Sequence, residues 1–259
     1  MADPLISFRD VRKAFDHPVL DGVSLDVHEG ETVSILGPSG TGKSVLLKTS
    51  IGLISVDGGD VIVDGESVLN GAKALKSIRS KVGYVFQYAA LFDSMTVYEN
   101  VALGIQDDQA RELGQGEVRK RIEAALEGVN LDPAAVLTKL PSELSGGMRK
   151  RVGLARATVG RPRILFYDEP VTGLDPVNTA AVSLLIGKIR DAYGVTSLVV
   201  THDVEQALEI SDRVVLLDHG KLRFVGTPQE FRANTDPLVQ AFGDRKAASV
   251  LAAQQQEEA

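Results

Sequence analysis

One stretch governs the fold of this protein: Gly37-Pro38-Ser39-Gly40-Thr41-Gly42-Lys43-Ser44. It matches the pattern G-x-x-x-x-G-K-[ST], in which a glycine-rich loop wraps its backbone N–H groups around phosphate oxygens. The apolar residues 31–36 before it are typical of a short buried strand, and residues 44–51 after it are typical of a helix. The loop therefore places a phosphate group at a helix N-terminus, where free amides and the helix dipole favour an anion.

Three residues around this loop are candidates for nucleotide contacts. Lys43 is predicted to reach the β- and γ-phosphates, and the Ser44 hydroxyl is predicted to bind Mg²⁺. Phe15 lies between two segments of alternating apolar residues, 5–11 and 19–27, which predict antiparallel strands. Its ring fits either stacking on a purine base or anchoring of the turn in the core, and the local sequence does not separate these interpretations.

The composition is that of an ordinary globular protein. The chain has 259 residues, 44% hydrophobic and 24% charged, which allows one large domain or two small ones. The absence of cysteine excludes disulfides and thiolate metal sites and fits a reducing cytosol. No apolar run approaches the roughly 18 residues that span a bilayer, and no signal peptide is expected, so a membrane role would need a partner.

The charge balance argues against nucleic acid as a partner. There are 28 basic and 35 acidic residues, giving a net charge of −7. The one dense basic cluster, Arg149-Lys150-Arg151, is predicted to be a solvated helix face.

Polar residues directly follow three predicted strands, at the strand ends where α/β sheets bind ligands. They are Gln87 after residues 81–86, Asp168-Glu169 after residues 163–167, and His202 after residues 195–200. Asp168 is predicted to hold Mg²⁺ and Glu169 to act as the general base on the attacking water. Gln87 is placed to reach Mg²⁺ or that water. His202 is placed to donate to the γ-phosphate or to hold the water and Glu169 in position. Taken singly, Gln87 is better explained as a strand cap and His202 as a structural residue, and the context of the site reverses this for His202. A surface turn is the alternative for Asp168-Glu169, but two adjacent carboxylates that end an apolar strand need partners.

Between about residues 88 and 161 the pattern becomes helical, which predicts an α-helical insertion in the sheet domain. Helices are expected at 96–104, 117–128 and 132–139, with residues 107–116 as a polar loop. Ser145, Gly146 and Gly147 precede a helix expected at 149–159. They form either a second anion site or an ordinary helix cap.

Taken together and in this order, the P-loop, Gln87, Leu144-Ser-Gly-Gly-Met148, Asp168-Glu169, Gly173-Leu-Asp175 and His202 resemble the nucleotide-binding domain of ABC transporters. The resemblance implies an α/β P-loop NTPase fold: a RecA-like mixed sheet core with flanking helices, an N-terminal antiparallel β subdomain and an inserted α-helical subdomain. The domain would cover residues 1–245, followed by a polar tail at 246–259.

The resemblance also assigns roles. It implies an ATP hydrolase with ATP and Mg²⁺ as cofactors, in which Phe15 stacks on adenine, Asp175 is the D-loop aspartate and His202 the switch histidine. It further implies a homodimer with ATP sandwiched head to tail, so that Ser145 to Gly147 of one copy contact the γ-phosphate held by the other.

Short stretches narrow the resemblance further. Met148 stands where the family usually has Gln. Together with residues 40–48, 86–95 and 236–243 it makes the chain similar to Mla-type ATPases, which work with a membrane permease and MCE-type lipid-binding proteins. The main expectation is thus a lipid-transport ATPase on the cytoplasmic face of the inner membrane. Alternatives are an ABC ATPase for another cargo, such as amino acids or other polar solutes, and a soluble non-transport ABC ATPase.

Overall fold

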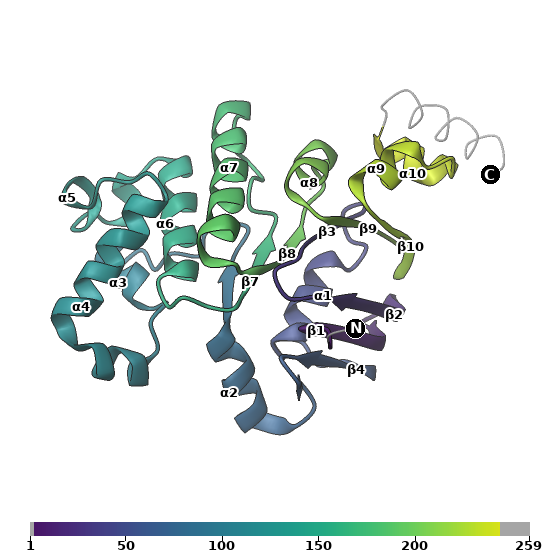
Figure 1. Cartoon of the computed structure of the whole chain (residues 1–259), viewed down its shortest axis with the longest axis horizontal. Coiled ribbons are helices and arrows are strands. Elements are labelled where there is room, and N and C mark those ends of the chain that lie inside the picture. Colours follow the sequence, from purple (N-terminus) through teal and green to yellow (C-terminus); the bar gives the residue numbers. More distant parts are fainter. Residues whose placement is uncertain (1–2, 244–259) are drawn as a thin grey trace. The chain divides into compact units, whose positions relative to one another are not determined.

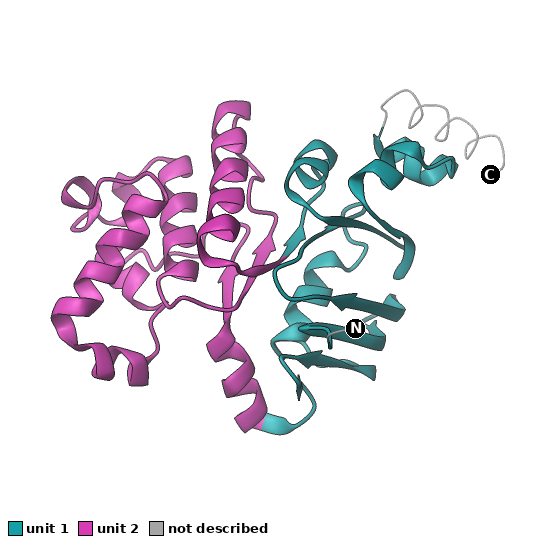
Figure 2. Cartoon of the chain, viewed as in Figure 1, with its two compact units in different colours: residues 1–71, 198–259 teal, residues 72–197 magenta. Residues whose placement is uncertain are grey.

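The computed structural model of the chain describes residues 3–243. Its internal contacts divide it into two compact units, unit 1 with residues 1–71 and 198–259 and unit 2 with residues 72–197 (Figure 2). The helical insertion expected at about 88–161 falls inside unit 2. The polar tail expected at 246–259 lies outside the described residues.

Unit 1 contains an antiparallel sheet with the strand order β2-β1-β4-β5 (Figure 1). Its strands are β1 Ile6–Ala14, β2 Pro18–Val27, β4 Gly58–Val63 and β5 Glu66–Ser67. In the central strand β1, Ile6 lies opposite Val27 on one side and Val63 on the other. The apolar residues of these strands are buried on one face. The antiparallel N-terminal sheet predicted from the alternating pattern is confirmed.

The second sheet of unit 1 has the order β10-β9-β3-β8. Its strands are β3 Thr32–Leu36, β8 Thr196–Val200, β9 Arg213–Asp218 and β10 Lys221–Gly226. β3 pairs in parallel with β9, and β9 pairs antiparallel with β10, so the sheet is mixed as expected. The helices are α1 Lys43–Ser50, α8 Val204–Ile210, α9 Pro228–Ala233 and α10 Pro237–Gly243. A core of Leu36, Leu216, Leu208, Phe231 and Val239 joins β3 and β9 to α8, α9 and α10.

Unit 2 combines parallel strands with a group of helices. Its strands β6 Val82–Val85 and β7 Ile164–Asp168 pair in parallel. The helices are α2 Gly71–Lys81, α3 Val97–Ala102, α4 Asp107–Gly128, α5 Pro133–Val136, α6 Gly146–Thr158 and α7 Pro176–Tyr193, with a 3₁₀ turn at Pro141–Glu143. α6 packs against α3, α4 and β6.

Two sequence-based expectations in the helical region are wrong. Residues 107–116, expected as a polar loop, open helix α4, interrupted only by the non-helical backbone of Gly114. Asp107 and Asp108 lie in the first turn, where negatively charged carboxylates interact favourably with the helix dipole. Helix α6 begins at Gly146 instead of residue 149, because the Ser145 hydroxyl accepts a hydrogen bond from the Met148 N–H at 3.2 Å and so caps the helix.

Gly104, just after α3, makes the closest backbone approach in unit 2. A Cβ on Gly104 would lie 1.9 Å from the Arg156 carbonyl oxygen of α6.

The Gly104→Ala variant is therefore expected to lose about 1–3 kcal/mol of unfolding free energy through overpacking. The measurement is the urea midpoint followed by circular dichroism. Gly116→Ala in α4 is the matched control, because nothing lies within 4 Å of its added methyl group. It should stabilise by about 1 kcal/mol, and equal midpoints for the two variants would contradict this account of packing.

Candidate functional site

The P-loop occupies the turn between β3 and α1 in unit 1. β3 ends at Leu36, and α1 begins at Lys43 with Gly42 as its N-cap residue. Gly42 has a left-handed backbone (φ 98°), and a Cβ there would lie 2.7 Å from the Val19 carbonyl oxygen. A Cβ on Gly37 would lie 2.2 Å from the Leu217 carbonyl oxygen. The loop geometry thus demands glycine at both ends of the motif.

The Lys43 side chain is folded back onto this loop. It is only 6% exposed, and its ammonium group donates hydrogen bonds to the carbonyl oxygens of Gly37 at 2.7 Å and Pro38 at 2.8 Å. The Thr41 hydroxyl also donates to the Pro38 carbonyl, at 2.9 Å. Pro38, Ser39 and Gly40 are exposed at the tip. A buried ammonium group therefore lies beneath an open, amide-rich loop, an arrangement suited to an anionic phosphate.

Two further predicted residues, His202 and Phe15, belong to unit 1. The Thr201 N–H donates to the Ile35 carbonyl oxygen at 3.2 Å, so the ends of β8 and β3 are adjacent. His202 is exposed and follows Thr201 in the chain. Gly37, the first residue of the P-loop, follows the end of β3 in the same way. Phe15 is 59% exposed in the turn before β2, which excludes core packing, and the Lys13 ammonium group lies 5.4 Å from its ring centroid. Its position fits the stacking interpretation.

In unit 2, Asp168 is the last residue of β7 and is 5% exposed. The Tyr84 hydroxyl of β6 donates a hydrogen bond to Asp168 Oδ2 at 3.0 Å. Burial, together with the Asp168 charge, raises the pKa of Tyr84 far above its usual value, so the phenol stays protonated and acts as a donor. Sequence reasoning missed Tyr84.

Glu169 has a strained backbone. Its φ of 51° is left-handed, a conformation that costs a non-glycine residue about 1–3 kcal/mol. Contacts from Thr172 hold it there. The Thr172 hydroxyl donates to Glu169 Oε2 at 2.9 Å, and the Thr172 N–H donates to the Glu169 carbonyl at 3.3 Å. Such strain is found where a side chain has to be aimed in one direction.

Gln87 follows β6, and its backbone is held by Lys150. β6 and β7 are paired in parallel with Val85 opposite Tyr167, so Gln87 and Asp168-Glu169 emerge at the same edge. Lys150 Nζ donates to the Gln87 carbonyl at 2.5 Å and approaches the Glu169 carbonyl at 3.5 Å. Burial lowers the pKa of Lys150, an effect that the Glu169 charge opposes.

The prediction that Arg149-Lys150-Arg151 is a solvated face is therefore wrong for Lys150, which is 9% exposed, while Arg149 is exposed. The sequence contains a spacing that indicates the burial of Lys150. Lys150, Leu154 and Thr158 are spaced by four residues, so they share the buried stripe of α6.

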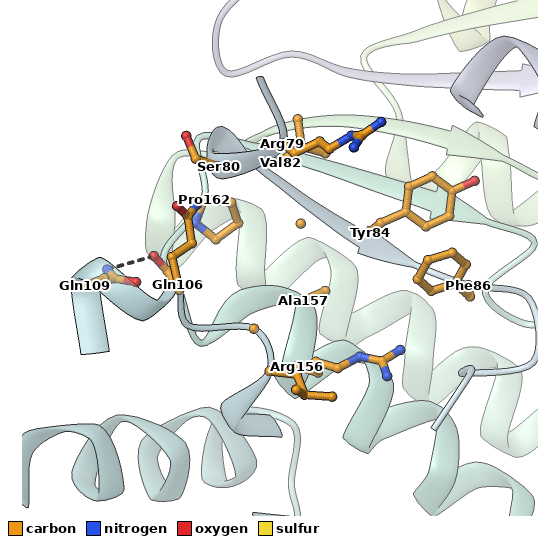
Figure 3. A pocket seen from close by; sticks show the side chains of 14 residues that line it. Arg79, Ser80, Val82, Tyr84, Phe86, Gln106, Gln109, Arg156, Ala157 and Pro162 are labelled. Atoms are coloured by element: carbon orange, nitrogen blue, oxygen red, sulfur yellow. Dashed lines mark hydrogen bonds between the residues drawn. The ribbon is translucent and has the colours of Figure 1, made fainter. Parts of the chain in front are cut away.

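Arg156, also on α6, holds the segment that follows Gln87. Its guanidinium donates to the carbonyl oxygens of Ala89 at 2.5 Å and Ala90 at 2.7 Å, and both alanines have left-handed backbones. Figure 3 shows Arg156 with Tyr84 and Phe86 around a cavity of about 240 Å³. The cavity is bounded by the end of α2, by β6, by the turn after α3 and by α6. Sequence reasoning missed both this pocket and Arg156.

The Ser145-Gly146-Gly147 motif starts α6, and Asp175 starts α7. Ser145 and Gly146 are exposed, so the first amides of α6 face outward. Asp175 caps α7 by accepting from the N–H groups of Val177 and Asn178, each at 3.0 Å. The Asn178 amide donates to Asp175 Oδ2 at 2.6 Å, and a Cβ on Gly147 would lie 2.9 Å from Asn178 Oδ1. The two helix starts therefore lie side by side in unit 2.

Two absences bear on the site. In the part of the chain that the structure describes, no three His, Cys, Asp or Glu side chains come together as a metal site. Among residues 3–243, no helix has both the length and the apolar character needed to cross a bilayer.

Comparison with known proteins identifies relatives that match most of this chain. The sulfate/thiosulfate import ATP-binding protein CysA 1 of Chromobacterium violaceum is 43% identical over 227 residues, which are 87% of this chain and 62% of that protein. The spermidine/putrescine import ATP-binding protein PotA of Thermotoga maritima is 40% identical over 226 residues, 87% of this chain and 59% of that protein. The chain thus spans about three fifths of the length of the curated relatives it matches.

Solved structures of ABC transporter proteins have a similar fold. CbiO1 from Clostridium perfringens, part of the ABC transporter complex cbiONQ, has a TM-score of 0.79 at 28% identity and covers 90% of this chain and 92% of its own. The ATP-binding cassette MJ0796, a dimer in a post-hydrolysis state bound to ADP and Pi, has a TM-score of 0.77 at 32% identity and covers 86% of this chain and 98% of its own. The P-loop NTPase fold is confirmed.

The expectation of an Mla-type subfamily with an MCE partner is not supported, because the relatives above are named for sulfate and polyamine import. The resemblance to Mla-type ATPases over short stretches therefore did not indicate the kind of cargo for which these relatives are named. The family itself is shown by a model described as ABC transporter, which matches residues 20–172. The chain belongs to the ABC transporter family.

Proposed function

We propose that this chain is the ATP-binding and ATP-hydrolysing subunit of a transporter. The observation that carries the proposal is the P-loop with its buried Lys43. The ammonium group donates to two carbonyl oxygens of the loop, and a phosphate oxygen would be a charge-assisted acceptor beside them. The N–H groups of the loop and of the first turn of α1 would bind the remaining phosphate oxygens. Phe15 would stack on the base, and His202, emerging beside the P-loop, would contact the γ-phosphate.

The residues present fit Mg²⁺ as the cofactor. Mg²⁺ usually keeps several waters and takes one or two carboxylates plus the phosphates of its nucleotide, so no three-residue protein site is needed. Ser44, Asp168 and Gln87 offer a hydroxyl, a carboxylate and an amide oxygen, all hard donors that suit this ion. When bound, the ion would neutralise charge that develops on the phosphates.

Glu169 is the proposed general base for the attacking water. Its strained backbone and its bond from Thr172 fix the direction of the carboxylate. Lys150 holds the neighbouring backbone, since its ammonium group donates to Gln87 and approaches Glu169 from α6. We assign Lys150 a positioning role, because it contacts main-chain oxygens and not the reacting atoms.

A homodimer would complete the site. The outward-facing amides of Ser145 to Gly147 form an anion site at the start of the thirteen-residue helix α6, and they need a phosphate from outside their own motif. A chain with one P-loop and one such motif would pair symmetrically, giving two composite sites. Asp175, at the neighbouring helix start, would lie at that interface. The dimeric state of MJ0796 supports this arrangement.

The transport partner would be an integral membrane permease that holds this subunit at the cytoplasmic face. The pocket of Figure 3 and the exposed Tyr88 and Phe92 after Gln87 offer it aromatic contacts. The names of the relatives favour import of a small polar or charged solute, such as sulfate or a polyamine. Phospholipid transport, the expectation drawn from Met148 and the stretch 86–95, has no support among these relatives and is the second candidate that the cargo assay has to exclude.

The cargo is tested by purifying the tagged chain from detergent-solubilised membranes and reconstituting it with its permease in liposomes. ATP-dependent uptake of radiolabelled sulfate or spermidine, lost in Lys43→Ala, is the expected result. Transfer of fluorescent phospholipid without solute uptake would favour the second candidate. Purification without any membrane partner would overturn the transport function and favour a soluble ATPase.

Glu169→Gln should lower ATP hydrolysis about 100-fold or more, because the base is lost. The side-chain oxygen of the introduced glutamine can still accept from Thr172, so the fold is kept. ATP binding should persist and hold the protein as a dimer. Phosphate release and light scattering after gel filtration measure the two effects.

Lys43→Ala is the control for this experiment, since it should lose both nucleotide binding and the ATP-dependent dimer. Parental hydrolysis in Glu169→Gln would show that the base is assigned wrongly. Unchanged ATP affinity in Lys43→Ala would rule out the P-loop as the phosphate site.

Lys150→Met should lower kcat about tenfold with a smaller change in KM, because charge-assisted hydrogen bonds that position Gln87 and Glu169 are lost. Steady-state ATPase assays measure this split. Lys120→Met is the matched control, because Lys120 is exposed on α4. A parental kcat in Lys150→Met would remove the positioning role.

A further inference from the structure

Tyr84 joins two features of unit 2. Its aromatic ring lines the pocket shown in Figure 3, beside Phe86 at a centroid separation of 4.4 Å. Its hydroxyl donates to Asp168 Oδ2 at 3.0 Å. One rigid side chain therefore spans the distance from the pocket wall to the buried carboxylate at the end of β7.

The contacts around Tyr84 leave its ring little freedom. Phe166 of β7 meets it edge to face, with centroids 6.3 Å apart, and the Phe86 ring packs closely against it. Arg156 lies 5.9 Å from the Phe86 ring centroid and holds the carbonyls of Ala89 and Ala90. A group that presses on the β6 wall of the pocket contacts Tyr84 and Phe86, and Phe86 directly precedes Gln87.

We propose that Tyr84 is a positioning residue that orients Asp168 for Mg²⁺ and makes this orientation depend on what occupies the pocket of Figure 3. This inference rests on the proposed function, in which Asp168 holds the metal. It goes beyond that function by giving a role to a residue that touches neither nucleotide nor metal.

The physical basis is the rotation of the carboxylate. A hydrogen bond to one oxygen of a metal-binding carboxylate fixes the plane of the group, and loss of such outer partners typically weakens metal binding about 10- to 100-fold. Asp168 is buried at the end of a strand, so bulk water has little access to replace the phenol. The pocket side of the ring transmits a contact to the hydroxyl because the phenol moves as one plane.

The first test is Tyr84→Phe, which keeps the ring and removes only the hydroxyl. Mn²⁺ serves as a paramagnetic substitute for Mg²⁺, and its affinity for the ADP complex is measured by electron paramagnetic resonance. Tyr84→Phe is expected to bind Mn²⁺ about tenfold more weakly. Tyr193→Phe is the matched control, because Tyr193 is exposed at the end of α7. Its Mn²⁺ affinity should equal that of the parent.

The outcomes separate the two proposals. If the parent binds no Mn²⁺ with ADP, the proposed function fails. If the parent binds Mn²⁺ and Tyr84→Phe binds it with the same affinity, only the role of Tyr84 is overturned. A urea midpoint for Tyr84→Phe establishes that the variant is folded when its affinity is measured.

The second test addresses the pocket and keeps Tyr84 in place. The chain has no cysteine, so Leu103→Cys creates a single thiol at the exposed pocket residue Leu103. Labelling this thiol with N-ethylmaleimide, a small reagent, attaches a compact group to the wall of the pocket. Labelling should change the Mn²⁺ affinity about fivefold when Tyr84 is present and leave it unchanged in the Tyr84→Phe background. The same change in both backgrounds, or no change in either, would overturn the link between pocket and Asp168.

Discussion

Three strands that are buried on both faces organise this structure. Every residue of β3, β7 and β8 is buried, so these strands have no place for an exposed polar side chain along their length. No charged side chain lies within these strands before their ends, where Gly37 follows β3, Asp168 closes β7 and His202 follows β8. An unpartnered charge inside these strands would cost several kcal/mol. The same constraint thus builds the core and collects the candidate functional residues at strand ends.

Around these ends, cations on α6 hold main-chain oxygens in place. Lys150 donates to Gln87, and Arg156 donates to Ala89 and Ala90. Left-handed alanines and a left-handed Glu169 are costly alone, and they persist because surrounding groups satisfy their carbonyls. Helix α6 also begins with the outward-facing amides of Ser145 and Gly146. In the proposed function, one helix therefore carries both an anion site and the restraints on the loop after β6, which is a physical route for coupling the two.

The spacing of motifs along the chain identified the family, and the short stretches used for a subfamily did not identify the relatives. Family motifs reflect the needs of phosphate chemistry: glycines for close approach, a lysine for charge and carboxylates at a strand end. Those needs are the same whatever a transporter carries. Met148 and its neighbours are not under that chemical constraint, so they say little about cargo. The motifs therefore establish the family, and transport assays have to establish the cargo.

Local pattern was enough to predict the P-loop between a strand and a helix, the antiparallel N-terminal strands, the strand ends that carry Gln87, Asp168, Glu169 and His202, and the family. These features depend on periodicity and on fixed spacing, which a linear sequence displays directly. Three other features became visible only in the folded chain: residues 107–116 are helical, Phe15 is exposed and Tyr84 meets Asp168. The contact of Tyr84 with Asp168 joins residues 84 positions apart, and neither such a pairing nor the burial that goes with it is displayed by local periodicity.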